Sequence, residues 1–197
     1  LSFFSQNFFG QLFIKDKKIF FNHYKNHINN ICDILRNIGV NINTVPVLDV
    51  RRKKSHSIIG SRSFSESSTV VSNLGRLCVG FYNKNKIGTV IKHMPGLGLS
   101  KCDSHYKTPI IKASKKELTK RDFKPFKACK SLFAMTAHAV YPKYDSYYTA
   151  THSKIIINEI IRNDMNFKGL LISDDISMKA LKYSLEENAL KALHAGC

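Results

Sequence analysis

One stretch of the sequence, Gly169-Leu170-Leu171-Ile172-Ser173-Asp174-Asp175, is a short apolar run that ends in two acids. Apolar residues without alternation are typical of a parallel strand that is covered on both faces. An acid directly after such a strand serves as a nucleophile, a metal ligand or the N-cap of the next helix. A pair of acids there leaves a functional site and a helix cap equally open.

Three further segments repeat this pattern of an apolar strand followed by polar residues. They are residues 44–49, which end in Asp49, residues 88–91, followed by Lys92 and His93, and residues 132–137, which precede His138. Helical spacing of apolar residues separates them, from about Lys18 to Ile38, from 70 to 81 and from 155 to 161. We expect Gly39 to end the first helix, a short helix to begin near Pro125, and serines to cap helices at Ser114 and Ser184.

Strands that alternate with helices predict a parallel α/β sheet. Polar residues at the carboxyl ends of the strands indicate the site in a doubly wound sheet and in a (β/α)8 barrel alike. A complete barrel needs roughly 250 residues, whereas this chain has 197. We therefore expect, if the fold is a barrel, about half of one.

The composition excludes several classes of protein. With 43% hydrophobic residues the chain is not disordered, and no apolar run is long enough to span a membrane. The start at Leu1 makes a poor signal peptide. Five cysteines without paired spacing predict free thiols and a reducing compartment, and hence a cytoplasmic protein.

The net charge of +17 raises the possibility of a nucleic-acid partner. The basic residues are mostly Lys and are spread along the chain, whereas Arg is the usual reader of bases and phosphates. The cluster Arg51-Arg52-Lys53-Lys54 is therefore interpreted first as a solvated loop.

The loop after residues 88–91 contains the sequence Asp103-Ser104-His105. The spacing allows the carboxylate to hold the imidazole and fix its tautomer, which suits general acid–base catalysis. Taken alone, an Asp-x-His sequence is more often a surface accident than a catalytic pair.

Four motifs in order are far more specific than any one of them. They are Lys-His-x-Pro-Gly-x-Gly from Lys92, Asp-Ser-His from Asp103, Met-Thr-Ala-His-x-x-Tyr-Pro from Met135, and Gly-Leu-Leu-Ile-Ser-Asp-Asp-Ile-Ser-Met from Gly169. Together they resemble glycoside hydrolase family 3, most closely the bacterial β-N-acetylhexosaminidases of peptidoglycan recycling. The segment 59–65 is also similar to a loop of this family, and the resemblance runs from about Ser5 to the last residue.

The resemblance implies a (β/α)8 TIM barrel that is incomplete, with about strands 3 to 6, as one partial domain over residues 1–197. It implies a retaining exo-β-N-acetylglucosaminidase of the bacterial cytoplasm that acts on muropeptides or related N-acetylglucosamine glycosides, with no cofactor, no nucleic acid and no membrane partner. Oligomeric state, the preferred leaving group, and hydrolysis against phosphorolysis stay open.

The resemblance also implies roles for six residues. Asp174 matches the nucleophile that forms a covalent glycosyl-enzyme, His105 matches the acid/base, and Asp103 orients that histidine. The residues that match those binding the N-acetylglucosamine unit are Arg62, Lys92 and His93. Leu97 and Ser61 stand where the family commonly has a basic residue and an acid.

Two other interpretations follow from the same sequence. Because a half-barrel lacks strands, the chain could be an inactive or sugar-binding remnant, either a fragment or a decaying reading frame. The basic composition alone would suggest a nucleic-acid-associated protein. His138 either faces the cleft or is satisfied by neighbouring backbone groups, and the other histidines show no metal-ligand spacing.

Overall fold

The computed structural model describes residues 4–53 and 56–197 and is built around a four-stranded parallel sheet. The strands lie in the order β1-β2-β3-β6, and every neighbouring pair is parallel. Their bounds are Ile42–Asn43 for β1, Gly88–Met94 for β2, Phe133–Thr136 for β3 and Leu170–Ser173 for β6. Four parallel strands in chain order, joined through helices, form part of a TIM barrel, as the sequence predicts.

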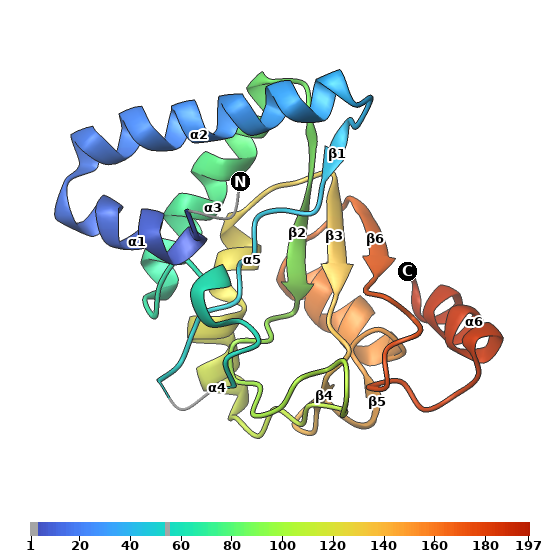
Figure 1. Cartoon of the computed structure of the whole chain (residues 1–197). Helices are drawn as coiled ribbons and strands as arrows, with labels where there is room; N and C mark the ends of the chain where they lie inside the picture. The colour runs from blue at the N-terminus through green and yellow to red at the C-terminus, as the bar shows by residue number, and fades with distance from the viewer. Residues whose placement is uncertain (1–3, 54–55) are drawn as a thin grey trace.

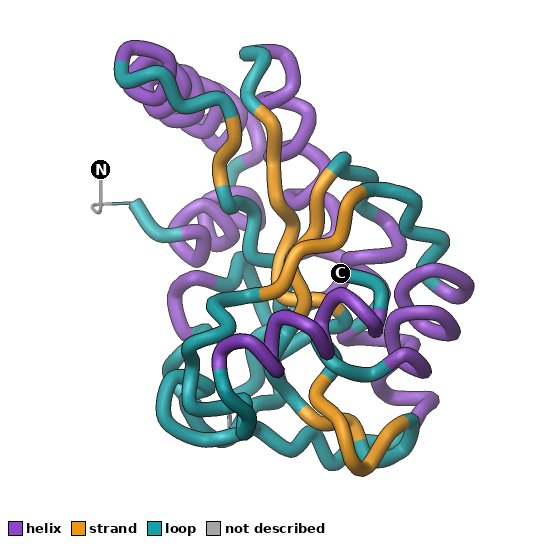
Figure 2. Tube along the Cα trace, turned by 90° about the vertical axis from the view of Figure 1, so that its right-hand side faces the viewer, coloured by secondary structure: helices purple, strands orange, loops and turns teal. Residues whose placement is uncertain are grey.

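Helices cover one side of this sheet and its ends. Figure 1 shows α5 to the left of β2 and α6 to the right of β6, and the strands lie among the surrounding helices in Figure 2. Contacts between α1 and α2, α2 and α3, and α3 and α5 join the helices into one layer. Their bounds are Gln6–Lys15 (α1), Lys17–Asn37 (α2), Ser68–Lys84 (α3), Lys115–Glu117 (α4), Lys124–Ala128 (α5) and Leu185–Ala195 (α6), with a 3-10 turn at Gly60–Arg62 and π-helical segments at Leu118–Asp122 and Ile156–Asp164.

Helix α2 forms where the apolar spacing predicts it. Its buried side chains recur every four residues, at Phe20, Tyr24, Ile28 and Cys32, and face the core. The helix stops before Gly39, which has a φ of 76°. A left-handed backbone at that position is easy for glycine and costly for other residues, so the predicted C-cap is confirmed.

The first predicted strand is wrong in its bounds. Regular pairing with β2 is confined to Ile42–Asn43 and is followed by a single bridge between Val47 and Lys92, so residues 44–49 form no continuous strand. Pro46 lacks the N–H that a strand interior donates. The chain still follows β2, because Lys92 N donates to Pro46 O at 3.1 Å and Leu48 N donates to Lys92 O at 2.7 Å.

Two elements have no counterpart in the sequence prediction. Helix α1 precedes α2 and begins at Gln6, after the N-cap Ser5, whose hydroxyl accepts from Phe8 N. The antiparallel pair of β4 (Val140–Tyr141) and β5 (Asp145–Thr149) follows β3. The capping serines behave as expected, but only Ser184 makes the full reciprocal capping box.

Both outer strands of the sheet have an open side within the described residues. There β6 pairs with β3 alone, and β1 pairs with β2 alone. Leu132 and Leu170, at the start of β3 and β6, are 75% and 59% exposed. Next to β1, the Gln6 side chain takes the place of a neighbouring strand: its Nε2 donates to Val47 O at 2.9 Å and its Oε1 accepts from Val47 N at 3.0 Å.

Candidate active site

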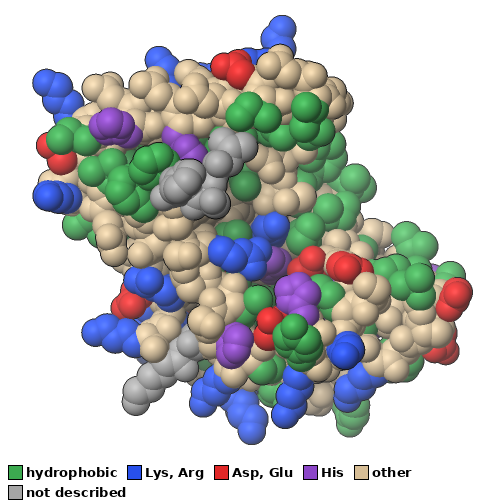
Figure 3. All heavy atoms as spheres, in the orientation of Figure 1, with side chains coloured by type: hydrophobic (Ala, Val, Ile, Leu, Met, Phe, Trp, Pro, Cys, Tyr) green, Lys and Arg blue, Asp and Glu red, His purple; other side chains and the backbone are tan. Residues whose placement is uncertain are grey.

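Four polar side chains meet at the carboxyl ends of the strands, and Figure 3 shows histidine and acidic side chains close together near the middle of the molecule. They are Asp49, His93, His138 and Asp174, each at or just after a strand-like segment. Nδ1 of His93 lies 2.6 Å from Asp49 Oδ2, and its Nε2 lies 3.8 Å from Asp174 Oδ2. The imidazole thus links a buried carboxylate to a carboxylate at the surface.

Asp49 is fully buried and has more than one partner. Its Oδ1 accepts from Leu97 N at 2.5 Å, and the backbone N of His93 lies 3.4 Å from Oδ2. One carboxylate therefore positions both the imidazole and the loop that follows β2. The sequence places Asp49 at a strand end but gives no sign of these partners.

The loop after β2 approaches the Asp49 turn so closely that it needs glycine. A Cβ on Gly98 would lie 2.0 Å from Val50 O, and one on Gly96 would lie 3.0 Å from Asp122 O. Gly96 also has a φ of 138°, a backbone conformation that side chains disfavour. Leu97, between these glycines, is buried in the core, so no polar side chain extends into the site from this position.

Asp174 is the more accessible of the two acids that flank His93: its side chain is 25% exposed, whereas that of Asp49 is fully buried. Its Oδ1 accepts from Asp175 N at 2.9 Å. Its Oδ2 faces His93 without a close hydrogen bond, because 3.8 Å is beyond hydrogen-bond distance. One carboxylate oxygen is therefore held by the loop while the other is available to a ligand.

Asp103 and His105 form the predicted pair. Asp103 Oδ1 lies 2.6 Å from His105 Nδ1 and accepts from His105 N at 2.8 Å. The backbone N–H of His105 lowers the pKa of Asp103, with a further contribution from its imidazole. Because Nδ1 is engaged, Nε2 remains for a ligand, and the His105 side chain is 58% exposed.

The loop that carries this pair is attached to the loop after β6. Ala180 N donates to Ser104 O at 3.2 Å, and Thr108 Oγ1 donates to Ala180 O at 2.7 Å. These two bonds flank His105 in the sequence. The two loops that carry His105 and Asp174 are therefore joined, although no direct bond connects the two side chains.

Asp175 organises its own loop. Its Oδ1 accepts from Ser177 N at 2.8 Å and from Ser177 Oγ at 2.6 Å, and these bonds lower the pKa of Asp175, with smaller contributions from His138 and His105. The carboxylate is thus occupied in shaping the turn.

His138 has both ring nitrogens satisfied. Nδ1 lies 2.7 Å from Thr151 Oγ1 and Nε2 lies 2.9 Å from Asp175 O. Burial lowers its pKa, which favours the neutral imidazole. Of the two interpretations left open for His138, the histidine that is satisfied by its neighbours fits the structure.

Lys92 and Arg62 line the same hollow of about 330 Å³, together with residues of α1 and of the segment before Asp49. Lys92 Nζ donates to Thr44 Oγ1 at 3.2 Å. Burial lowers the pKa of Lys92, Arg62 adds to this effect, and Asp174 and Asp49 oppose it. Neither cation has a close carboxylate partner among the residues that the structure describes, so both can donate to hydroxyl groups of a ligand.

In the basic cluster, Arg51 and Arg52 are paired with acids, Lys53 is exposed, and Lys54 lies outside the described residues. Arg52 donates to Asp122 Oδ2 at 2.6 Å and to Glu117 Oε1 at 2.9 Å, and its side chain is 14% exposed. Arg51 lies 3.6 Å from Glu66. Burial raises the pKa of Asp122 to about 6, although Arg52 acts in the opposite direction.

In the described part of the chain, no group of three or more His, Cys, Asp or Glu side chains is arranged to hold a metal ion. Over residues 4–53 and 56–197, no helix has both the length and the apolar character that crossing a membrane requires.

Comparison with known proteins identifies the family of the chain. The model of the glycosyl hydrolase family 3 N terminal domain matches residues 24–197. The chain belongs to glycoside hydrolase family 3. The family 3 chain is 32% identical over 166 residues to a β-hexosaminidase of Actinobacillus pleuropneumoniae, covering 81% of this chain and 47% of the relative. It is 33% identical to a β-hexosaminidase of Haemophilus influenzae, covering 81% and 46%.

Solved structures of family 3 proteins match the fold as well. NagZ from Neisseria gonorrhoeae superposes with a TM-score of 0.89 at 29% identity, covering all of this family 3 chain and 59% of NagZ. A family 3 β-N-acetylglucosaminidase from Paenibacillus superposes with a TM-score of 0.82 at 28% identity, covering 85% and 33%. The chain spans about half the length of the curated relatives it matches.

Proposed function

We propose that this chain carries the catalytic residues of a retaining exo-β-N-acetylglucosaminidase and that residues 1–197 form one partial barrel domain of it. The observation that carries the proposal is the position of Asp174. Its carboxylate is open on one oxygen, lies at the end of β6, and faces His93 at 3.8 Å. The named relatives are β-hexosaminidases, which supports this choice among the reactions that an exposed acid at a strand end could perform.

In the proposed first step, Asp174 attacks the anomeric carbon of the sugar. A bond forms between Oδ2 and that carbon while the bond to the glycosidic oxygen breaks, and His105 gives the leaving oxygen its proton. In the second step, His105 takes a proton from water, the hydroxide oxygen bonds to the anomeric carbon, and Asp174 leaves as a carboxylate. Two displacements retain the configuration at the anomeric carbon.

His105 suits this double role because of Asp103. The carboxylate 2.6 Å from Nδ1 holds the imidazole so that Nε2 is the nitrogen that exchanges the proton with the substrate. After it has given up this proton the histidine is neutral, so it places no second negative charge next to Asp174, as a second carboxylate would.

Arg62, Lys92 and His93 bind the N-acetylglucosamine unit in this proposal. Lys92 and Arg62 line one hollow, and Lys92 is close enough to Asp174 to interact with its charge. His93 is held in place from behind by Asp49, which therefore acts as a positioning residue. Ordered donors of this kind recognise sugar hydroxyls without the entropic cost of first fixing the side chains.

The proposed substrates are N-acetylglucosamine-terminated muropeptides or related glycosides in the bacterial cytoplasm, cleaved without a cofactor. Support comes from the fold match to NagZ from Neisseria gonorrhoeae, which has been solved in complex with N-trifluoroacetyl-D-glucosamine. The pairing of Arg51 and Arg52 with acids leaves these two arginines less available to a nucleic acid, although the net charge of the chain is unaffected by it.

The test is covalent labelling of Asp174. The chain, alone and completed with the remaining segments of the Actinobacillus pleuropneumoniae relative, is treated with a 5-fluoro N-acetylglucosaminyl fluoride and digested. Mass spectrometry is expected to find the sugar on Asp174, and Asp174→Asn is expected to remain unlabelled because the attacking charge is gone.

Asp175→Asn is the matched control for this experiment. It removes the neighbouring acid, whose carboxylate is bound to Ser177, and is expected to keep the label. A label on Asp175, or labelling of Asp174→Asn, would contradict the assignment of the nucleophile.

A second candidate function is a sugar-binding remnant without catalysis. The open sides of β1 and β6 favour it, because a site with unpaired strands on both sides holds its catalytic groups less firmly. Saturable binding of N-acetylglucosamine by the chain, together with an absence of labelling and of turnover, would select this function.

A further inference from the structure

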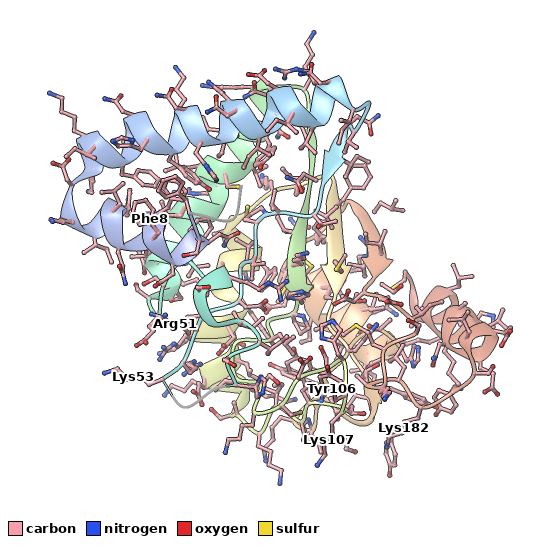
Figure 4. All side chains as sticks on the ribbon, in the orientation of Figure 1. Phe8, Arg51, Lys53, Tyr106, Lys107 and Lys182 are labelled. Atoms are coloured by element: carbon pink, nitrogen blue, oxygen red, sulfur yellow. The ribbon has the colours of Figure 1, made fainter. Side chains whose placement is uncertain are left out.

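Tyr106, the residue that follows His105, presents an unusually open aromatic ring. It is 74% exposed, and no other ring in the described residues stacks on it. Figure 4 shows Tyr106 beside Lys107 at the end of the molecule where the strands point, with Lys182 on the neighbouring loop. An exposed aromatic ring at the margin of a polar site is a common element of ligand binding.

The backbone that presents this ring is fixed. Asp103 O accepts from Tyr106 N at 3.1 Å and from Lys107 N at 3.0 Å, which closes a tight turn. The same turn is attached on either side to Ala180, through Ser104 O and Thr108 Oγ1. The backbone is therefore already ordered, so a ligand that stacks on the ring has little left to immobilise.

The position of the ring relative to His105 determines which part of a substrate it meets. A general acid must touch the oxygen that joins the sugar being transferred to the group that leaves. The transferred sugar lies toward Asp174, His93 and Lys92, which are the more buried groups. In the proposed reaction the leaving group therefore lies on the exposed side of His105, and Tyr106 is the next residue of the chain.

We propose that Tyr106 is a platform for a leaving-group sugar, stacking on the apolar face of the pyranose ring attached to the terminal N-acetylglucosamine. The inference rests on the proposed function, since it needs His105 to contact the glycosidic oxygen. It adds a specificity-determining residue: substrates with a second pyranose bind through this ring, and simple glycosides do not use it.

Sugar binding by residues 1–197 tests the platform without requiring turnover. The ligands are N-acetylglucosamine and a sulfur-linked β-1,4 disaccharide of N-acetylglucosamine, which resists hydrolysis. Dissociation constants are measured by calorimetry for the parent chain, Tyr106→Ala and Tyr106→Phe. Phe21→Ala is the matched control, because Phe21 is an exposed aromatic residue on α2, outside the proposed site.

We expect Tyr106→Ala to weaken disaccharide binding by about tenfold, the effect of losing one stacked ring. Binding of the monosaccharide should stay within twofold, and Tyr106→Phe should keep the parent's affinity for both ligands. Phe21→Ala should change neither. Circular dichroism spectra are compared to establish that all variants fold alike.

Three outcomes would overturn the platform: an unchanged disaccharide affinity in Tyr106→Ala, an equal loss for both ligands, or no disaccharide binding by the parent. The proposed function is judged separately by the label on Asp174. A labelled Asp174 with no effect of Tyr106→Ala removes the platform alone, whereas an unlabelled chain that binds neither sugar removes both.

Discussion

The buried carboxylate of Asp49 lies 2.6 Å from Nδ1 of His93, although the two residues are 44 positions apart in the sequence. Asp49 also accepts from the backbone of Leu97. A single side chain thus connects the end of one strand-like segment to the next strand and to the loop beyond it. The proposed sugar-binding face of His93 depends on this support.

Removal of Asp49 is expected to destabilise the chain. In Asp49→Ala the Leu97 N–H and the His93 imidazole lose their buried acceptor, at a cost of about 3 kcal/mol in unfolding free energy. Asp49→Asn should cost less, because its amide oxygen can still accept from Leu97. Urea denaturation gives the values, with Asp33→Ala as a control, since Asp33 forms an exposed pair with Arg36. Equal effects for Asp49→Ala and Asp33→Ala would contradict a supporting role.

Loss of the acid/base should depend on the leaving group. In the completed barrel, His105→Ala is expected to slow glycosylation strongly for a poor leaving group, because that oxygen then departs without a proton. An activated aryl glycoside needs little protonation and should be affected far less. Asp103→Ala should show a milder form of the same pattern. Single-turnover rates measure this step, and equal losses for both substrates would mean that His105 binds sugar rather than transferring protons.

Asp122 gives the stability of the chain a specific pH dependence. Burial raises its pKa to about 6 in the folded chain, whereas an unfolded Asp releases its proton near 4. Between these values the folded state binds more protons, so this residue's contribution falls as the pH rises, by about 3 kcal/mol in total. Above about pH 6 no further change comes from this group.

The measurement compares the parent with Asp122→Asn from pH 4 to pH 7. As the pH rises from about 4 to about 6, the unfolding free energy of the parent should fall relative to that of Asp122→Asn. His138, whose pKa burial lowers, contributes with the opposite sign, because its unfolded form binds the proton first. Its contribution is the same in both proteins and cancels. A difference that does not vary with pH would exclude the raised pKa.

The open side of β6 should cause self-association. Leu170 is exposed at the amino end of β6, which pairs with β3 alone among the described residues. We expect the chain to associate as its concentration rises, and Leu170→Lys to reduce this, because charge on an outer strand opposes strand addition. Sedimentation velocity measures the effect, with Ile14→Lys on α1 as an equally exposed control. A parent that stays monomeric would contradict the expectation.

Much of the fold follows from the sequence because its signals are local and repeated. The four-residue spacing of Phe20, Tyr24 and Ile28 defines α2, and the apolar runs define β3 and β6. Helix α1 gives a weaker signal, since Gln6, Asn7 and Gln11 interrupt its apolar face. The bounds of the first strand could not be predicted, because pairing with β2, rather than composition, decides which residues are regular.

The same distinction holds for the candidate site. The pairing of Asp103 with His105 spans two residues, so the sequence alone suggests it. The contact of Asp49 with His93 and the bonds from Ala180 to the His105 loop join distant segments, and they exist only once the sheet has formed. The burial of Arg52 against Asp122 is likewise a tertiary effect, hidden in a basic cluster that looks solvated.

The two hydrogen bonds between the Gln6 side chain and the Val47 backbone make exchange of the Val47 amide proton sensitive to ligand binding in the hollow. The N–H of Val47 has a side chain of α1 as its acceptor, and both residues line the hollow with Arg62 and Lys92. Hydrogen exchange at Val47 therefore occurs when α1 undocks, and a sugar seated in the hollow should slow it. A helix outside the stretch that the family model matches thus couples its own local unfolding to ligand occupancy.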